Sequence, residues 1–237
     1  MTVKPKSPAD ENGLLAALPS TIYERLKPNL TPVRLDAGST LYDTGSRIEL
    51  VWFITRGLVS LRTTTKDGGV IEAAAIGREG IVGLSGIARR NGTVYWAQVQ
   101  ISGKALQISA SALRTAVGQG SVFYEFLFQY TYSLNEQISQ EKVCSQFHTT
   151  EQRLARWLLT AYDRVSSDAL VITHDNMAQT LGVSRSRISL AAGVLQRRGL
   201  IHYLRGHIRT LNRKGLEDAS CECYRTISRA ISYYPPI

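Results

Sequence analysis

The sequence contains few cysteines, no long apolar run and no apolar core near its N-terminus. Three cysteines occur among its 237 residues, too few for the disulfide framework of a small secreted protein. No apolar run approaches the length of a membrane span, and residues 1–13 lack the hydrophobic core of a signal peptide. We therefore expect a soluble, cytoplasmic protein with no membrane partner, long enough for two modest domains.

Acidic residues are also absent from residues 176–216, where eight lysines and arginines occur. The whole chain has a formal net charge of +9. From Phe147 onward, 13 Lys/Arg stand against seven Asp/Glu, so the basic excess lies mainly in the C-terminal part. Such a concentration of positive charge is typical of a surface that binds double-stranded DNA. The alternative is an ordinary solvated face, and the motif in the same stretch makes that interpretation the weaker one.

This stretch has the pattern of a helix, a tight turn, a second helix and a hairpin. Thr173 is a candidate N-cap for the first helix, and Gly182 supplies the turn. Ser184 is a candidate N-cap for a second helix over about residues 185–198. Arg205-Gly206 fits the two-residue turn of a hairpin. The pattern predicts a winged helix-turn-helix.

A recognition helix enters the major groove of DNA by its N-terminal residues. Arg185 is the strongest candidate for reading a base, because arginine can donate two parallel hydrogen bonds to guanine. Ser186 and Ser189 are more permissive readers, while Arg187 and the wing residues are better placed for phosphates. The full set of predicted DNA-binding residues is Thr173, Ser184, Arg185, Ser186, Arg187, Ser189, His207 and Arg209.

The N-terminal half has the composition of a β-structure. Between residues 32 and 109, short segments rich in β-branched and aromatic residues alternate with glycines. This spacing predicts a compact antiparallel barrel or sandwich. Gly57 and the Asp67-Gly68 pair are predicted hairpin turns.

Residues 122–145 contain no Gly or Pro and are predicted to form one helix, about 36 Å long at 1.5 Å per residue. Its stripe, spaced by three or four residues, consists of Phe123, Leu127, Tyr130, Leu134, Ile138 and Glu141. Such a stripe is usually the face that a helix buries in its own domain. The length of this helix favours instead a contact between two copies of the chain. A further helix is predicted to begin near Thr149, where Thr149 and Gln152 fit a capping box.

The order of these elements resembles the Crp/Fnr superfamily of bacterial transcription regulators. The resemblance is carried by DAGSTLYDTGSRIELVWFITRGLVSL (36–61), NEQISQEKVCSQFHTTEQRLARWLL (135–159) and LGVSRSRISLAAGVLQRRGLI (181–201). It implies an α+β fold with an antiparallel β-roll sensor domain of the cupin-like or jelly-roll kind at 1–118, a dimerisation helix at 119–146 and a winged helix-turn-helix DNA-binding domain at 147–237. It also implies a homodimer whose β-roll senses a signal, with RNA polymerase as a further candidate partner.

The resemblance also shows where this chain departs from members that bind cyclic AMP. Those members carry a Gly-Glu pair that binds the ribose and an Arg-Ser pair that binds the phosphate. Here the corresponding positions are Gly83-Leu84 and Gly92-Thr93-Val94, so we expect an effector other than cyclic AMP. Arg89 and Arg90 lie nearby, although exposed charges of this kind usually form a surface loop. Ser139 and Gln140 align with positions that meet adenine. The candidate effector-binding residues are therefore Arg89, Arg90, Thr93, Ser139 and Gln140.

We predict no metal and no cofactor. An iron–sulfur cluster of the kind some relatives carry takes four cysteine ligands, and only Cys144, Cys221 and Cys223 are present. The close pair Cys221 and Cys223 is a weak indication of zinc, because no other Cys or His stands near it in the sequence. His148 is interpreted as a hydrogen-bonded structural residue.

The sequence disfavours two other function classes. An enzyme is disfavoured, because the spacing suggests no Ser-His-Asp arrangement, no phosphate-cradling Gly-Lys motif and no two-histidine metal motif. An effector-binding module that acts through protein contacts without DNA is disfavoured by the basic helix-turn-helix. The sequence therefore predicts a homodimeric, non-enzymatic transcription regulator that binds a pseudo-palindromic operator and responds to an unidentified effector.

Overall fold

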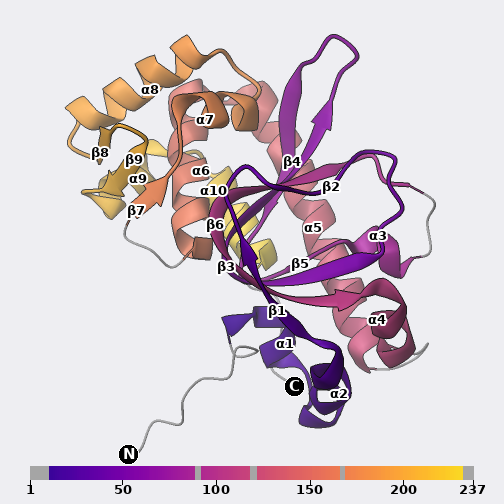
Figure 1. The fold of residues 1–237 in the computed structure, drawn as a ribbon. Helices are drawn as coiled ribbons and strands as arrows, with labels where there is room; N and C mark the ends of the chain where they lie inside the picture. The colour runs from indigo at the N-terminus through magenta and orange to yellow at the C-terminus, as the bar shows by residue number, and fades with distance from the viewer. Residues whose placement is uncertain (1–10, 89–91, 118–121, 166–168, 232–237) are drawn as a thin grey trace, which may run out of the picture.

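The computed structural model describes residues 11–88, 92–117, 122–165 and 169–231. Figure 1 shows a β-roll, the long helix α5 (Val122–Phe147) packed beside it, and a mostly helical C-terminal part that contacts both. We call this C-terminal part, residues 150–231, the head. The α+β architecture predicted from the sequence, an antiparallel roll followed by a long helix and a helix-turn-helix, is confirmed.

The β-roll is one antiparallel sheet with the strand order β1-β6-β3-β4, in which β2 also pairs with β6 and β5 with β3. Its strands are β1 (Thr31–Leu35), β2 (Thr40–Tyr42), β3 (Leu50–Thr64), β4 (Val70–Ile76), β5 (Ile81–Val82) and β6 (Trp96–Ser109). Its helices are α1 (Gly13–Ala17), α2 (Ser20–Leu26), the 3-10 turn η2 (Lys27–Asn29), α3 (Leu84–Ile87) and α4 (Ala110–Val117).

The two hairpin turns predicted in this half have different outcomes. The Asp67-Gly68 pair does lie in the turn between β3 and β4, and Gly68 has a φ of 86°. Gly57 is not a hairpin turn, because β3 continues through it. It takes a φ of 89° inside the strand, where the register between β3 and β6 shifts on either side of Arg56. Gly57 therefore forms a bulge that bends the longest strand.

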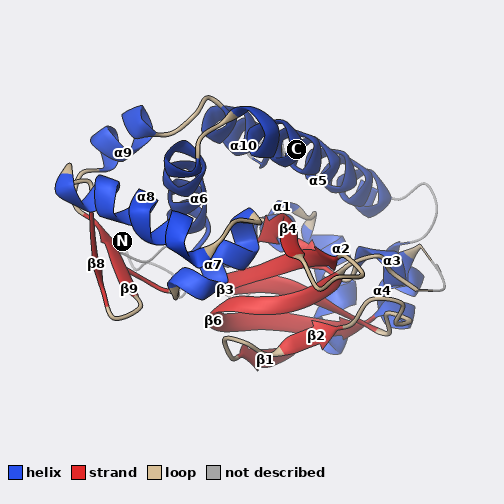
Figure 2. Cartoon of the chain, turned by 90° about the horizontal axis from the view of Figure 1, so that it is seen from above, coloured by secondary structure: helices blue, strands red, loops and turns tan. Residues whose placement is uncertain are grey.

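The long helix packs its predicted stripe against its own β-roll. Phe123, Leu127 and Tyr130 are buried in a cluster with α1, α4 and the strands, and Leu134 packs on a second cluster inside the roll. The prediction that this stripe favours contact between two chains is wrong, because the sheet needs an apolar cover and α5 supplies it. Figure 2 shows α5 along one side of the roll, with α10 (Cys223–Ile231) beside it.

A different face of α5 is exposed among the described residues. Besides Val122 at its first position, five large apolar side chains on this helix are exposed: Tyr124, Phe128, Tyr132, Val143 and Phe147. The exposed fractions of Phe128 and Tyr132 are 62% and 61%, which is high for aromatic residues in the middle of a helix. We refer to these five residues as the apolar strip of α5.

The head consists of α6 (Thr150–Val165), β7 (Ala169–Val171), α7 (His174–Leu181), α8 (Arg185–Arg197), β8 (Ile201–Leu204), β9 (His207–Thr210), α9 (Arg213–Ala219) and α10. The predicted capping box begins α6: the Thr149 N–H donates to Gln152 Oε1 at 3.0 Å, and the Gln152 N–H donates to Thr149 Oγ1 at 3.3 Å. Strand β7 was not foreseen and completes a three-stranded sheet in the order β7-β9-β8.

The head and the β-roll share a continuous packed interface. Leu58, Ala75 and Ile101 of the roll belong to the same buried cluster as the core of the head. Polar groups also cross this interface, since the indole N–H of Trp157 donates to Glu72 Oε1 at 3.1 Å. No described helix is long and apolar enough to cross a membrane.

Candidate nucleic-acid interface and effector pocket

The helix-turn-helix forms with the predicted caps. Thr173 Oγ1 accepts from the Asn176 N–H at 3.2 Å at the start of α7, and Ser184 Oγ accepts from the Arg187 N–H at 3.4 Å at the start of α8. Between the two helices Gly182 takes a φ of 60°, the left-handed conformation that ends α7. Met177 and Leu195 are fully buried, so the crossing of α7 and α8 is fixed by packing as well as by caps.

The N-terminal end of α8 is exposed and basic. Arg185, Ser186, Arg187 and Ser189 are all solvent-exposed, and Leu190 beside them is 72% exposed. The opposite face of α8 is buried in the core of the head. The predicted contact residues of this helix therefore share the surface from which a recognition helix meets the major groove.

One acidic residue borders this surface. Asp175 Oδ1 lies 3.4 Å from Arg185 Nε, and both side chains are more than half exposed. Asp175 directly precedes the acid-free stretch 176–216, so the composition of that stretch does not reveal this carboxylate. An exposed pair of this kind holds an arginine only weakly, and it leaves the guanidinium free to exchange the carboxylate for another acceptor.

The wing adopts the predicted hairpin. Arg205 and Gly206 take φ values of 47° and 85°, the pair of positive angles that a type I′ turn requires. His207 and Arg209 are exposed, whereas Ile208 between them is buried. The two predicted phosphate contacts therefore project from the same face of β9.

His174, which was not among the residues predicted from the sequence, connects α7 to both α8 and the wing. Its ring stacks on Tyr203 at a centroid distance of 4.2 Å, and its Nδ1 lies 2.9 Å from Ser189 Oγ. Burial and the nearby charge of Arg185 lower the pKa of His174. A neutral His174 positions Ser189, one of the predicted base readers. A histidine at the first position of a helix does not by itself indicate such a contact in the sequence.

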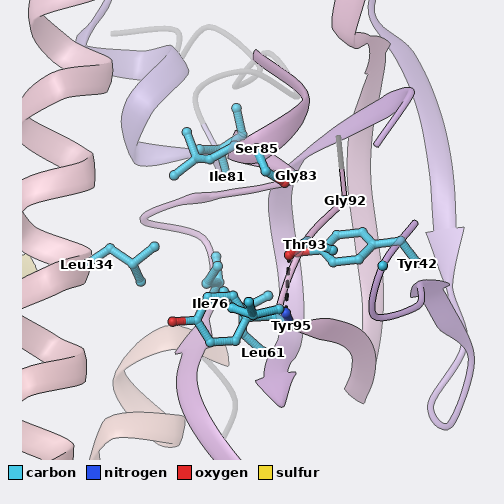
Figure 3. A pocket seen from close by; sticks show the side chains of 13 residues that line it. Tyr42, Leu61, Ile76, Ile81, Gly83, Ser85, Gly92, Thr93, Tyr95 and Leu134 are labelled. Carbon is cyan, nitrogen blue, oxygen red and sulfur yellow. Dashed lines mark hydrogen bonds between the residues drawn. The ribbon is translucent and has the colours of Figure 1, made fainter. Parts of the chain in front are cut away.

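A pocket of about 450 Å³ opens in the β-roll beneath α5. Its walls are mainly apolar, and Figure 3 shows Leu134 reaching from α5 into it. The Tyr95 N–H donates to Thr93 Oγ1 at 3.2 Å on one wall (Figure 3). Burial and the neighbouring Tyr95 raise the pKa of Tyr42, so its hydroxyl remains protonated. The residues found at the cyclic-AMP cassette positions line this pocket: Gly83, Leu84, Gly92, Thr93 and Val94.

The candidate effector-binding residues are not all brought together. Thr93 lines the pocket in the β-roll. Ser139 and Gln140 instead line a groove between α5 and α10, together with Phe128 and Tyr132 of the apolar strip. Arg89 and Arg90 lie outside the described residues. Within one chain, the α5 residue that reaches the pocket is Leu134.

The three cysteines and His148 meet where α5 ends. Cys144 Sγ lies 3.6 Å from Cys221 Sγ, and Cys223 Sγ lies 3.6 Å from His148 Nδ1. No other Cys or His is near Cys221 and Cys223 in the sequence, but the fold brings Cys144 and His148 to them because α10 returns to the C-terminal end of α5. The hydrogen bond with Cys221 lowers the pKa of Cys144, and the same contact raises the pKa of Cys221.

Comparisons with known proteins agree with this architecture. Residues 152–219 match the Crp-like helix-turn-helix domain. The structure of FixK2 from Bradyrhizobium japonicum is similar with a TM-score of 0.70 and 18% identity over 81% of this chain and 98% of that one. A crp/fnr family regulator from Eubacterium rectale has a TM-score of 0.67 and 18% identity over 89% of this chain and 98% of that one. No curated protein matches the chain in sequence. The resemblance to Crp/Fnr regulators is thereby confirmed in the helix-turn-helix domain and in the fold.

Proposed function

We propose that this chain, a transcription regulator of the Crp/Fnr type, acts as a homodimer that binds a pseudo-palindromic operator. The observation that carries the proposal is the uncovered basic end of α8, with Arg185 and Arg187 both exposed beside the wing. Two copies of this helix related by a two-fold axis would meet half-sites about 10 base pairs apart.

The two arginines have different proposed roles. Arg185 follows the N-cap directly and would donate two hydrogen bonds to a guanine, exchanging its exposed pair with Asp175 for base contacts. Arg187, two residues later on the same end of α8, would contact phosphates together with His207 and Arg209. Thr173, Ser184, Ser186 and Ser189 would add hydrogen bonds along the same edge.

The apolar strip of α5 is the proposed dimer contact. Its members Tyr124, Phe128, Tyr132 and Val143 recur along one face of the helix, with Ser139 on the same face. Exposed aromatic residues in this number on one helix usually mark a protein interface. A second copy of α5 placed against the strip would cover it.

The β-roll pocket is the proposed effector site. Its described lining contains no lysine or arginine, and Leu84 occupies the position at which a carboxylate would bind a ribose. We therefore propose an uncharged, largely apolar effector and no tight binding of cyclic AMP. Loss of two charge-assisted contacts, each worth about 1.5–3 kcal/mol, lowers affinity by a factor of about one hundred or more.

Operator binding can be tested by selecting bound sequences from random DNA and then measuring isotherms on the selected site and on single-mismatch sites. Arg185→Ala should cost about 1–3 kcal/mol and remove discrimination at one base pair in each half-site. Arg187→Ala should weaken all sites alike and reduce the salt slope of log K by about one per lost phosphate contact.

The control is Arg34→Ala, because Arg34 is exposed on β1, where it forms an ion pair with Asp36. This variant should bind DNA as the unchanged protein does. Selection that yields no preferred sequence would favour a module that acts without DNA. Equal loss of affinity on every sequence for Arg185→Ala would make Arg185 a phosphate contact.

A further inference from the structure

Four potential metal ligands from three separate segments converge in the described part of the chain. Cys144 lies near the end of α5, and His148 follows in the link to α6. Cys221 precedes α10, and Cys223 is its first residue. Their ligand atoms all lie within 4.8 Å of one another. This convergence requires contacts between residues 77 positions apart, so local sequence does not force it.

Two of the separations between these ligand atoms match the edges of one tetrahedral site. With zinc–sulfur bonds of about 2.3 Å and zinc–nitrogen bonds of about 2.0–2.1 Å, the edges of the tetrahedron are about 3.8 Å between sulfurs and about 3.6 Å between sulfur and nitrogen. The Cys144–Cys221 and Cys223–His148 separations are both 3.6 Å. A disulfide needs sulfurs about 2.05 Å apart, and a cluster of several irons would hold its ligands farther apart.

Outer contacts orient the ligands in the way that metal sites require. His148 presents Nδ1 to Cys223, while its Nε2 lies 3.2 Å from Glu222 Oε1. This is the carboxylate–histidine arrangement that fixes the ring and increases its basicity. The side-chain amide of Gln140 donates to Cys223 Sγ at 3.0 Å, a contact that stabilises a thiolate.

The burial of the four ligands and the charges around them are typical of a structural zinc site with no open coordination position. All three cysteines are buried, and the His148 side chain is 12% exposed. Three thiolates, one neutral imidazole and Zn²⁺ carry one net negative charge. The buried Arg153 interacts electrostatically with Cys144 and would balance it.

We propose that Cys144, His148, Cys221 and Cys223 bind one Zn²⁺ ion in a tetrahedral site. Each thiol releases its proton to solvent as its sulfur becomes a ligand. The ion joins the end of α5, the link to α6 and the start of α10, and so holds the head on the long helix. Cys221 and Cys223 lie beyond residues 152–219 that match the Crp-like domain, and the site does not depend on the proposed DNA contacts.

The test begins with the metal content of the purified full-length protein, measured by inductively coupled plasma mass spectrometry. We expect one zinc per chain. After chelation, titration with Co²⁺ should produce the visible bands of tetrahedral cobalt together with thiolate-to-cobalt charge transfer. Competition with a chromophoric chelator then gives the apparent zinc affinity.

Three variants and one control define the ligands. Cys221→Ser and His148→Gln should abolish stoichiometric zinc, and Glu222→Gln should weaken affinity by about tenfold because it removes only the outer carboxylate. His202→Gln changes an exposed histidine of the wing and should leave the zinc content unchanged. Glu222→Gln should fold even if Cys221→Ser and His148→Gln do not, because Glu222 is mostly exposed. In that case the zinc affinity of Glu222→Gln and the cobalt spectrum of the unchanged protein test the proposed ligands.

The proposal is overturned by a protein that contains no zinc, binds no cobalt and shows three free thiols. Iron with the absorption of a cluster would also overturn it, as would a Cys144–Cys221 disulfide found by peptide mass spectrometry.

Discussion

The ion pair between Glu141 on α5 and Arg156 on α6 should be among the most costly contacts in the protein to break. Arg156 Nη1 and Nη2 donate to the two carboxylate oxygens at 2.6 and 2.7 Å. The Arg156 side chain is 2% exposed and that of Glu141 is 17% exposed. Burial raises the pKa of Glu141, but the two parallel hydrogen bonds from Arg156 require an ionised carboxylate.

Glu141→Gln keeps the size of the side chain and removes its charge, so Arg156 becomes an uncompensated buried cation. Breaking a buried pair in this way costs about 3–5 kcal/mol. We expect the lower end of this range, because the amide oxygen can still accept one of the two hydrogen bonds. Replacing both partners, as Glu141→Leu with Arg156→Met, removes the charges together and should cost less than about 1 kcal/mol.

The free energy of unfolding from urea titration, followed by circular dichroism, measures both effects. The control is Asp218→Asn, which breaks the exposed pair with Lys214 on α9 and should cost at most about 0.5 kcal/mol. If Glu141→Gln costs no more than Asp218→Asn, the pair is not buried as the structure has it. If the double variant is as unstable as Glu141→Gln, the cost comes from lost packing and not from charge.

Three further expectations concern the interface, a cap and pH. Replacing both Phe128 and Tyr132 by Asp should make the protein monomeric, as measured by light scattering. Tyr132→Phe keeps the apolar surface and should remain dimeric, so a monomeric Tyr132→Phe protein would contradict the apolar contact. Thr149→Ala removes the capping box of α6 and should lower the free energy of unfolding by about 1 kcal/mol, with Thr64→Ala, on an exposed position of β3, as the control. Burial raises the pKa of Glu72, so its neutral form stabilises the fold below the unfolded pKa of about 4.3, and this contribution is lost as pH rises through the folded pKa. Glu72→Gln should flatten that decline in urea titrations above about pH 4, and an unchanged slope would refute it.

The features predicted correctly are those that short stretches of sequence specify. Thr173 and Ser184 cap their helices, and Gly182 and the Arg205-Gly206 turn adopt the required positive φ angles. Each of these depends on hydrogen bonds or backbone strain within a few residues. The winged helix-turn-helix could therefore be located almost to the residue, without knowledge of the rest of the fold.

The incorrect predictions concern features whose structure depends on residues far away in the sequence. The period of the stripe through Phe123 and Leu127 correctly gave a helix with an apolar face, but it could not say whether the β-roll or a second chain covers that face. The local sequence around Gly57 fits either a hairpin turn or a β-bulge, and which of the two forms depends on the register between β3 and β6. The approach of Cys144 to Cys221 depends on the packing of α10 on α5, which no local pattern encodes.

Helix α5 is the element through which the proposed effector site could influence the head. Leu134 lines the pocket, Glu141 holds α6, and Cys144 belongs to the cluster that includes α10. These positions span about 15 Å of one helix at 1.5 Å per residue. An effector shifts an equilibrium between two conformations only by the difference in its affinity for them. The effector must therefore contact α5 differently in the two conformations. Leu134 is the α5 side chain that lines the pocket and can make such a contact. Since Glu141 and Cys144 attach the head to the same helix, a displacement of α5 at Leu134 must either carry the head with it or break the buried pair. The cost of about 3–5 kcal/mol for breaking the pair opposes the second outcome, whereas the first must disrupt the packing of the head on Leu58, Ala75 and Ile101 of the β-roll.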